Sequence, residues 1–438
     1  MKRASSVSGV LIFTCVIGAP SRLDAQSTSP WGRVSFMAQS FSATESGHSV
    51  PSFSELILSA TLASPARDEG GFEYRFDMRT AGYPQAGTRD ARFSLYDGYV
   101  GQRFAGGAFG VRVGQMWLND LGGLGSIGGV QGEFVRRNVA GFKRLRIGAF
   151  GGLEPKVLEA GYVSDVTKAG TYFALEGQGA WRNVLGFVLV RNSGLTERAV
   201  LTTTNFLPIG RTFLVYQSAE VDLVGPAGNG SGGLTYFFTN ARYSPVPVVE
   251  LQGLFHRGRS IDARTITLDQ LNGRPISQRA LEGLLYESAG GRVTFTVVRG
   301  FRLFAGYARD RNNREDAPTN RITLGGFASN VLGSGFDVRV SDDRVDGPTS
   351  SYDSWYGSVG RSLGPRIYLS VDYSSSFSVF RLLGQQGLLI ENRPRTDRYS
   401  LSGLVNLTRF ISVLGSLERT LDGGFDEWRW MSGLTYRF

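Results

Sequence analysis

The sequence predicts an all-β protein that forms a single closed antiparallel β-barrel spanning a membrane. Three observations predict it: apolar and polar residues alternate along segments of roughly ten to fourteen residues, aromatic residues stand at segment ends, and short turns alternate with long ones. After the N-terminal segment, no window of about eighteen apolar residues is present, which excludes a helical membrane protein.

The alternation is clearest at the C-terminus. Residues of one parity are apolar and those of the other are polar or small: Trp428, Trp430, Leu434, Tyr436 and Phe438 against Arg429, Gly433, Thr435 and Arg437. Successive side chains of an extended strand point to opposite faces, so this segment has one apolar and one polar face. The same pattern covers residues 292–297 and 367–373.

Segment length and aromatic positions favour a membrane over a soluble sheet. A tilted strand needs about nine to eleven residues to cross a bilayer, against about five or six in a soluble sheet. Aromatic rings prefer the interface between lipid and water, and here they stand beside the expected short turns, at Phe104, Phe109, Trp181, Tyr243, Phe301, Phe410 and Phe438.

Turn lengths give the strand count. Tight turns are predicted near Thr408, Gly364, Gly300, Pro245, Asn183, Ala140 and Gly106, and longer connections at residues 258–290, 118–128, 152–170, 311–318 and 377–395. Counting from Trp31 gives 22 strands, within a range of 16 to 22. The sheet must close, because each unpaired backbone group facing hydrocarbon costs several kcal/mol.

The N-terminus is predicted to be a signal peptide over residues 1–25, which leaves residues 26–438 as the barrel. Lys2 and Arg3 precede an apolar stretch at residues 7–17 that is too short for a membrane helix, and we expect cleavage after Ala25. Lipid attachment at Cys15 is disfavoured by the preceding Phe13 and Thr14. Cleavage would remove the only cysteine, so thiol catalysis and thiolate metal sites are excluded.

The last strand, "WRWMSGLTYRF", resembles the C-terminal signal that bacterial outer-membrane β-barrel proteins present to the barrel-assembly machinery. Trp430, Leu434, Tyr436 and Phe438 match that signal, while Ser432 departs from its apolar pattern. The resemblance covers residues 31–438 and points to the class, not to one family. It implies a Gram-negative outer membrane, contact with its lipid, assembly by that machinery, short periplasmic turns, long outer loops and usually a transport role.

Arginine is the most promising functional residue. Only four of the 47 basic residues are lysine, and the net charge is +9. The arginines are scattered, which argues against nucleic-acid binding. Parity places four of them on the polar, lumen-facing side, where they could concentrate anions: Arg292, Arg302, Arg429 and Arg437. Alternatively, they pair with inward carboxylates such as Asp372 and only stabilise the barrel.

The predicted function is therefore a porin-like channel for small polar solutes, anionic ones among them, with no cofactor or metal. The alternative is a barrel filled by its loops that acts as a binding or assembly component. An energy-coupled receptor is not expected, because a first strand near Trp31 leaves no room for a plug domain ahead of it.

Enzyme activity is not predicted. The only histidines are His48, in a polar loop, and His256, which we interpret as a rim residue. An outer-membrane hydrolase would need a serine or acidic partner beside His256. Two other segments are read as ordinary outer loops: Asp342, Asp343 and Asp346, whose spacing fits no calcium loop, and residues 122–129, which lack the lysine of a phosphate loop.

The segment 260–288 is predicted to contain one short amphipathic helix. Ile276, Ala280, Leu281, Leu284 and Leu285 fall at helical spacing after Pro275. This helix could fold into the pore and narrow it, or it could cap the rim.

Overall fold

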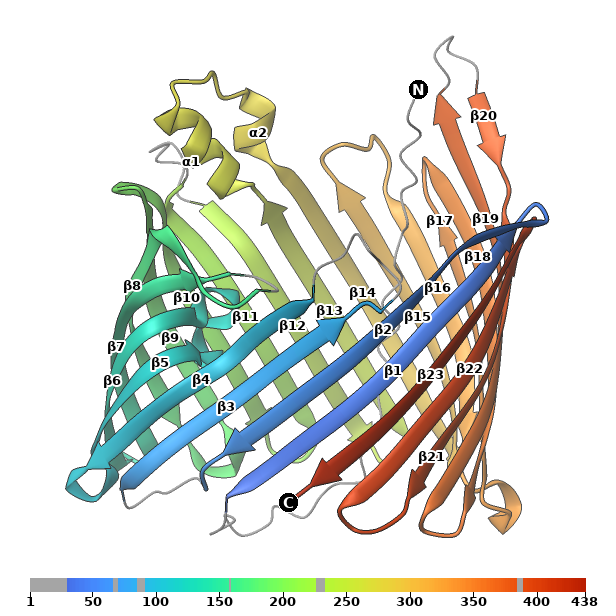
Figure 1. The fold of residues 1–438 in the computed structure, drawn as a ribbon, viewed down its shortest axis with the longest axis horizontal. Helices are drawn as coiled ribbons and strands as arrows, with labels where there is room; N and C mark the ends of the chain where they lie inside the picture. Colours follow the sequence, from blue (N-terminus) through green and yellow to red (C-terminus); the bar gives the residue numbers. More distant parts are fainter. Residues whose placement is uncertain (1–29, 66–69, 85–90, 157–158, 226–232, 384–388) are drawn as a thin grey trace.

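The computed structural model describes residues 30–65, 70–84, 91–156, 159–225, 233–383 and 389–438, and in it one antiparallel sheet closes on itself as a barrel (Figure 1). The first strand, β1 (Trp31–Glu45), pairs with the last, β23 (Phe425–Arg437), from Arg33 opposite Arg437 to Glu45 opposite Phe425. Gly32 and Phe438 exchange two backbone hydrogen bonds of 2.9 and 3.0 Å, so no sheet edge is left open at this seam.

The strands between follow in chain order, and each except β20 pairs with the next: β2 (His48–Ala63), β3 (Gly71–Gly82), β4 (Arg92–Phe104), β5 (Phe109–Trp117), β6 (Ser126–Val139), β7 (Phe142–Pro155), β8 (Tyr162–Glu176), β9 (Arg182–Asn192), β10 (Leu195–Ile209), β11 (Phe213–Val224), β12 (Gly233–Val246), β13 (Val249–Ser260), β14 (Leu284–Val298), β15 (Phe301–Asn312), β16 (Thr319–Ala328), β17 (Phe336–Asp346), β18 (Ser350–Leu363), β19 (Ile367–Leu383), β20 (Leu389–Asn392), β21 (Arg395–Asn406) and β22 (Ile411–Asp422). β20 pairs only with the end of β19, and β21 pairs with the rest of it, so the two occupy one place in the wall. The wall therefore has 22 strands, as predicted.

The start of β1 and the end of β23 lie at the lower edge of Figure 1, as do the short turns predicted from the sequence. Three connections at the upper edge are equally short, at residues 46–47, 193–194 and 423–424. The turns near Gly106, Ala140, Gly300, Gly364 and Thr408 are where the sequence predicted them. The turn predicted near Pro245 falls at Pro247 and Val248. The turn predicted near Asn183 was wrong by several residues: Asn183 already pairs with Leu175 and Asn205, and the chain reverses between Gly177 and Trp181, around η3 (Gln178–Ala180).

Most upper loops are shorter than predicted, because the strands continue beyond the lipid-crossing length. β7 runs to Pro155 and β8 starts at Tyr162, within the segment expected as loop. Asp342, Asp343 and Asp346 lie in β17 and not in a loop, which corrects that interpretation. Residues 126–129, read as part of a glycine-rich loop, belong to β6.

The connection between β13 and β14 contains two helices, α1 (Ala263–Leu271) and α2 (Gln278–Glu282), where one was predicted. Leu284 and Leu285, assigned to the helix by their spacing, instead begin β14. The helix missed by the sequence pattern starts at a cap: the Thr265 amide donates to the Asp262 carboxylate at 3.0 Å. That hydrogen bond lowers the pKa of Asp262. None of the helices in the described residues is long and apolar enough to cross a membrane.

One face of the wall carries large apolar side chains that no other described segment covers. Phe295 and Val371 are 49% and 58% exposed, for example. Aromatic pairs occupy the lower strand ends, among them Phe104 with Phe109 and Phe142 with Trp181, with ring centroids 6.5 and 5.3 Å apart. Further up the wall, the Tyr373 ring contacts those of Trp355 and Tyr399 across β18, β19 and β21. An apolar outer face with aromatic rings at its lower boundary is a surface that suits lipid.

Gly129 marks a place where β6 and β7 approach too closely for a side chain. A Cβ built there would lie 2.1 Å from the Gly151 carbonyl oxygen, whereas one at Gly132 would meet nothing within 4 Å. We expect Gly129→Ala to destabilise the barrel by about 1–3 kcal/mol, since backbone must shift, and Gly132→Ala to be neutral. Denaturant unfolding of both variants in detergent checks this, and equal stability would contradict it.

Candidate functional site in the barrel lumen

One half of the barrel interior is filled. After β5 the chain forms η2 (Asn119–Gly125), which contacts β8, β9 and β10 on the face opposite the lipid-facing Leu185 and Phe187. The Leu121 side chain is 1% exposed and lies over Gly186. A Cβ built on Gly186 would be only 2.2 Å from the Cδ2 atom of Leu121. The apolar cluster around η2 is Met116, Leu118, Leu121, Leu124, Ile127, Phe150, Val166, Tyr172, Val188, Val190 and Val200.

A network of ion pairs joins η2 to the wall and runs across β3 to β8. Asp120 of η2 pairs with Arg146 at 2.7 Å and with Arg182. Glu133, with a side chain only 5% exposed, accepts from Arg103 (2.9 Å), Arg146 (3.1 Å) and the Tyr172 hydroxyl (2.6 Å). Further members are Glu73, Arg112, Arg144 and Glu176. Each of these arginines has a carboxylate partner, so they stabilise the wall.

The long loop between β13 and β14 is anchored over this same half, where Figure 1 shows α1 and α2 above the wall. Arg264 of α1 binds Glu197 of β10 at 2.9 Å and also binds Glu154 of β7. Burial alone would lower the pKa of Arg264, but hydrogen bonds to both glutamates raise it. Ile266 and Thr267 are 2% and 1% exposed, so α1 packs firmly against the rim.

The other half of the wall carries a different set of arginines. Arg302 and Arg339 lie in one row across β15, β16 and β17, with Phe327 between them. Arg292 of β14 lies with its guanidinium 3.7 Å from the centre of the Phe304 ring. We call Arg292, Arg302 and Arg339 the arginine patch. All three occupy the parity opposite to the lipid-facing Phe295, Leu303 and Val340.

Within the described residues, no carboxylate comes within 4.0 Å of a guanidinium nitrogen of the arginine patch. Glu250 and Asp343 act electrostatically on Arg292, as does Arg339. Glu250 is bound and neutralised by Arg242 at 2.9 Å, whereas Asp343 accepts from the neutral Thr323 hydroxyl, which does not cancel its charge. Three guanidiniums against this one carboxylate leave the patch with a net positive charge.

The local sequence explains how the patch is held. Gly325 leaves room for the Phe304 ring, because a Cβ there would lie 2.4 Å from its Cζ atom. Phe304 is only 9% exposed and supports the Arg292 guanidinium by a cation–π contact. Arg339 was not identified from the sequence as a lumen-facing residue. It alternates with Val338 and Val340, and this is the same pattern that identified Arg292.

The two other arginines singled out in the sequence lie elsewhere. Arg429 pairs with Glu427 at 2.9 Å on the same strand. Arg437 lies opposite Arg33 at the seam. Asp372, expected as a partner for inward arginines, instead accepts from the Tyr356 hydroxyl at 2.7 Å. The four residues of the C-terminal signal, Trp430, Leu434, Tyr436 and Phe438, are 45–49% exposed on the apolar face.

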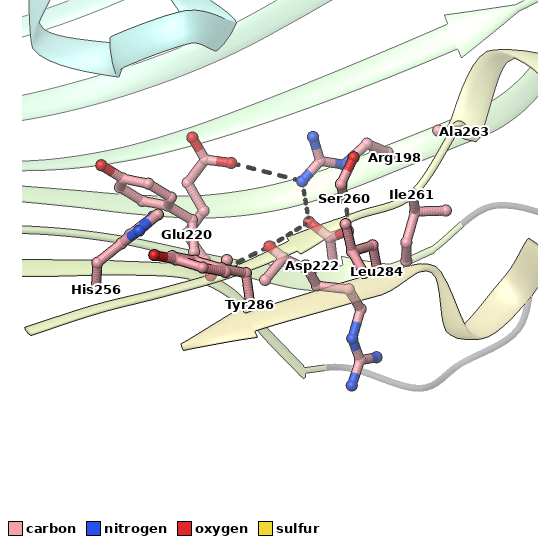
Figure 2. A pocket seen from close by; sticks show the side chains of 13 residues that line it. Arg198, Glu220, Asp222, His256, Ser260, Ile261, Ala263, Leu284 and Tyr286 are labelled. Atoms are coloured by element: carbon pink, nitrogen blue, oxygen red, sulfur yellow. Dashed lines mark hydrogen bonds and ion pairs between the residues drawn. The ribbon is translucent and has the colours of Figure 1, made fainter. Parts of the chain in front are cut away.

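A cavity of about 320 Å³ opens at the mouth, between the upper ends of β10 to β14 and the start of α1 (Figure 2). His256 lines it, with ring centroids 5.5 Å from Tyr236 and 5.7 Å from Tyr286. Ser288 of β14 lies opposite His256, and Asp310 of β15 lies opposite Ser288. The Asp310 carboxylate, however, accepts hydrogen bonds from Tyr286 and Arg321. No hydrogen bond joins His256 to a serine or carboxylate in the described part of the chain.

His48 lies in the β1–β2 hairpin, where its Nδ1 is 3.2 Å from the Ser46 carbonyl oxygen. In the described residues no three metal-binding side chains gather in one place.

A closed barrel whose uncovered outer face is apolar requires an apolar surrounding such as the lipid of a bilayer. The chain therefore folds as a membrane-spanning β-barrel. No protein-family model and no curated protein matches it.

Solved structures with similar architecture include the translocation pore of the P pilus usher PapC, with 12% identity, a TM-score of 0.46, and 92% of this chain and 99% of that one covered. Acinetobacter baumannii OccAB4 has 10% identity, a TM-score of 0.47, and coverage of 95% and 100%. Pseudomonas aeruginosa OccK3 has 11% identity, a TM-score of 0.42, and coverage of 93% and 95%. At this level of similarity, what the chain does must be argued from its own residues.

Proposed function

We propose that this protein is a porin-like channel that passes small polar solutes and favours anions. The observation that carries the proposal is the arginine patch: three guanidiniums on the polar face of β14, β15 and β17, without an ion-pair partner in the described residues. The paired arginines of the filled half would not do this, because their charges are already neutralised.

Electrostatics supports the proposal. Like charges held close together repel, and a passing carboxylate or phosphate relieves that repulsion while accepting hydrogen bonds from guanidinium forks. The polar faces of β18, β19 and β21 offer hydroxyls beside the patch, among them Ser358, Ser370 and Ser402, together with the carboxylate of Asp372 opposite Ser358. A wall of arginines and serines suits hydrated solutes better than apolar ones.

The test is the conductance of the purified protein in planar bilayers under a potassium chloride gradient. We expect open channels whose reversal potential lies on the chloride side. An insulating barrel would contradict channel function, and a reversal potential on the potassium side would contradict anion preference.

The alternative is a loop-filled barrel that acts as a binding or assembly component, without enzyme activity in either case. η2 and α1 favour it, because they occupy the interior and the rim of the same half. An insulating wild-type barrel that begins to conduct when residues 263–282 are deleted would support this alternative. In both cases we propose that the barrel-assembly machinery recognises the last strand.

A further inference from the structure

We propose that the cavity at the mouth, which we call the mouth pocket, binds a small organic cation through its ammonium group. The inference is independent of the proposed function, because it concerns a different set of residues. His256 stands four residues further along β13 than Gln252, the neighbour of Arg292. At about 3.3 Å per residue, the pocket is therefore about 13 Å above that arginine on the same wall.

The pocket is built from one row of residues across four strands. From β11 to β14, the residues that lie opposite one another in this row are, in order, Glu220, Tyr236, Gly258 and Tyr286. The glycine contributes no side chain between two tyrosines that are two strand spacings apart, or about 9.6 Å, and this leaves a slot that the His256 ring borders. A cation centred in that slot would be within the roughly 6 Å over which aromatic rings attract positive charge.

His256 closes the slot below. A Cβ at Gly258 would lie 3.4 Å from the His256 Nε2 atom, at ordinary contact distance, so the His256 ring lies directly beside the glycine, and a side chain larger than a methyl group would have to share this space with it. The rings of Tyr236 and Tyr286 are tilted by 63° and 53° from the His256 ring. Three rings at such angles form a concave aromatic surface rather than a flat wall.

Two carboxylates, Glu220 and Asp222, and two arginines, Arg198 and Arg259, line the pocket. Arg198 is held by Asp222 through two hydrogen bonds, of 2.7 and 3.2 Å, which neutralise it. Glu220 has only a long contact of 3.5 Å to the same guanidinium, drawn as a dashed line in Figure 2. Arg259 follows Gly258 on β13 and so has the parity of the opposite face of the wall. On the face that carries the tyrosines, Glu220 is therefore the charged group left to balance a ligand's charge.

This combination selects the ligand class. Aromatic faces and a spare carboxylate attract an ammonium group and repel carboxylates and phosphates. The volume of about 320 Å³ admits a molecule of a few heavy atoms and excludes a peptide or an oligosaccharide. A primary or quaternary ammonium compound fits these conditions.

The probe is choline, compared with 3,3-dimethylbutan-1-ol, which has the same shape without the charge. Binding is measured by isothermal titration calorimetry on the full protein in detergent, so the measurement does not depend on conduction. We expect the wild-type protein to bind choline with an affinity about tenfold higher than that for the uncharged isostere. Gly258→Leu should abolish choline binding by filling the slot. Glu220→Gln should lower the affinity for choline about tenfold.

Two matched variants keep the test sharp. Gly253→Leu adds the same side chain on the lipid face of β13, where a Cβ meets nothing within 4 Å, and should bind like the wild type. Glu418→Gln removes a carboxylate that pairs with Arg398, far from the pocket, and should also bind normally. Choline binding that survives in Gly258→Leu, equal affinity for choline and its isostere, or no binding at all would each overturn the proposal.

Discussion

Replacing Glu133 with alanine is expected to destabilise the barrel by about 3–5 kcal/mol, the cost of leaving buried charges without their partner. Its carboxylate accepts from Arg103, Arg146 and Tyr172, and its side chain is 5% exposed. Arg146 would keep Asp120 and Glu176, but Arg103 would retain only Glu73, at 3.3 Å. Losing Glu133 would also destabilise the attachment of η2, because Asp120 of η2 is bound to the wall by Arg146, one of the partners of Glu133.

Guanidinium unfolding in detergent, followed by tryptophan fluorescence, measures this effect. Glu159→Ala is the control, since the Glu159 side chain is 67% exposed and its only ion pair among the described residues is a contact of 3.8 Å with Lys156. Surface pairs of this kind contribute about 0–1 kcal/mol. If Glu133→Ala and Glu159→Ala unfolded at the same denaturant concentration, the network would not be the stabilising element inferred here.

Changing Arg292, Arg302 and Arg339 together to glutamine is expected to lower the chloride-to-potassium permeability ratio roughly threefold to tenfold. Three charges about 10 Å from an ion in water contribute together about 1.2 kcal/mol, and 1.4 kcal/mol is a factor of ten. Salt screens part of this effect, so the measurement belongs at low ionic strength. Replacement of the same three residues by lysine should preserve the anion preference.

The control removes the same number of charges from the other face of the wall. Arg344, Arg395 and Arg419 have the parity of lipid-facing residues such as Ile322, Phe377 and Trp428, and each pairs with an aspartate. Their triple glutamine variant should keep the reversal potential of the wild type. A similar shift in both variants would mean that net charge, rather than the arginine patch, sets the selectivity.

The barrel itself could be predicted from the sequence because its determinants are local. Alternation and turn residues are readable one strand at a time, and the C-terminal strand alone shows both faces. The strand ends were less predictable. Asp342 and Asp343 look like loop residues in isolation, yet they continue β17, because ladder pairing with Trp355 and Ser354 extends past the bilayer, where charge carries no cost.

The pairing of arginines could not be predicted, because partners come from strands far apart in the sequence. Arg264 meets Glu154 and Glu197 only because a loop folds back over the rim. Parity identified Arg292, but it could not distinguish it from Arg146, which has the same pattern and three carboxylate partners. Likewise, η2 has no periodic pattern, and its position is explained by its packing against Gly186 and by the ion pairs of Asp120 with Arg146 and Arg182.

The seam between the first and last strands has a consequence for how the molecule is made. Its hydrogen bonds join residues about 400 positions apart, as between Ser35 and Thr435. Contacts of such large separation form slowly. Until these contacts form, the unpaired edges of β1 and β23 must be shielded from lipid and from other chains. Weak pairing at the seam should therefore lower the yield of inserted protein while leaving the conductance of the molecules that do insert unchanged.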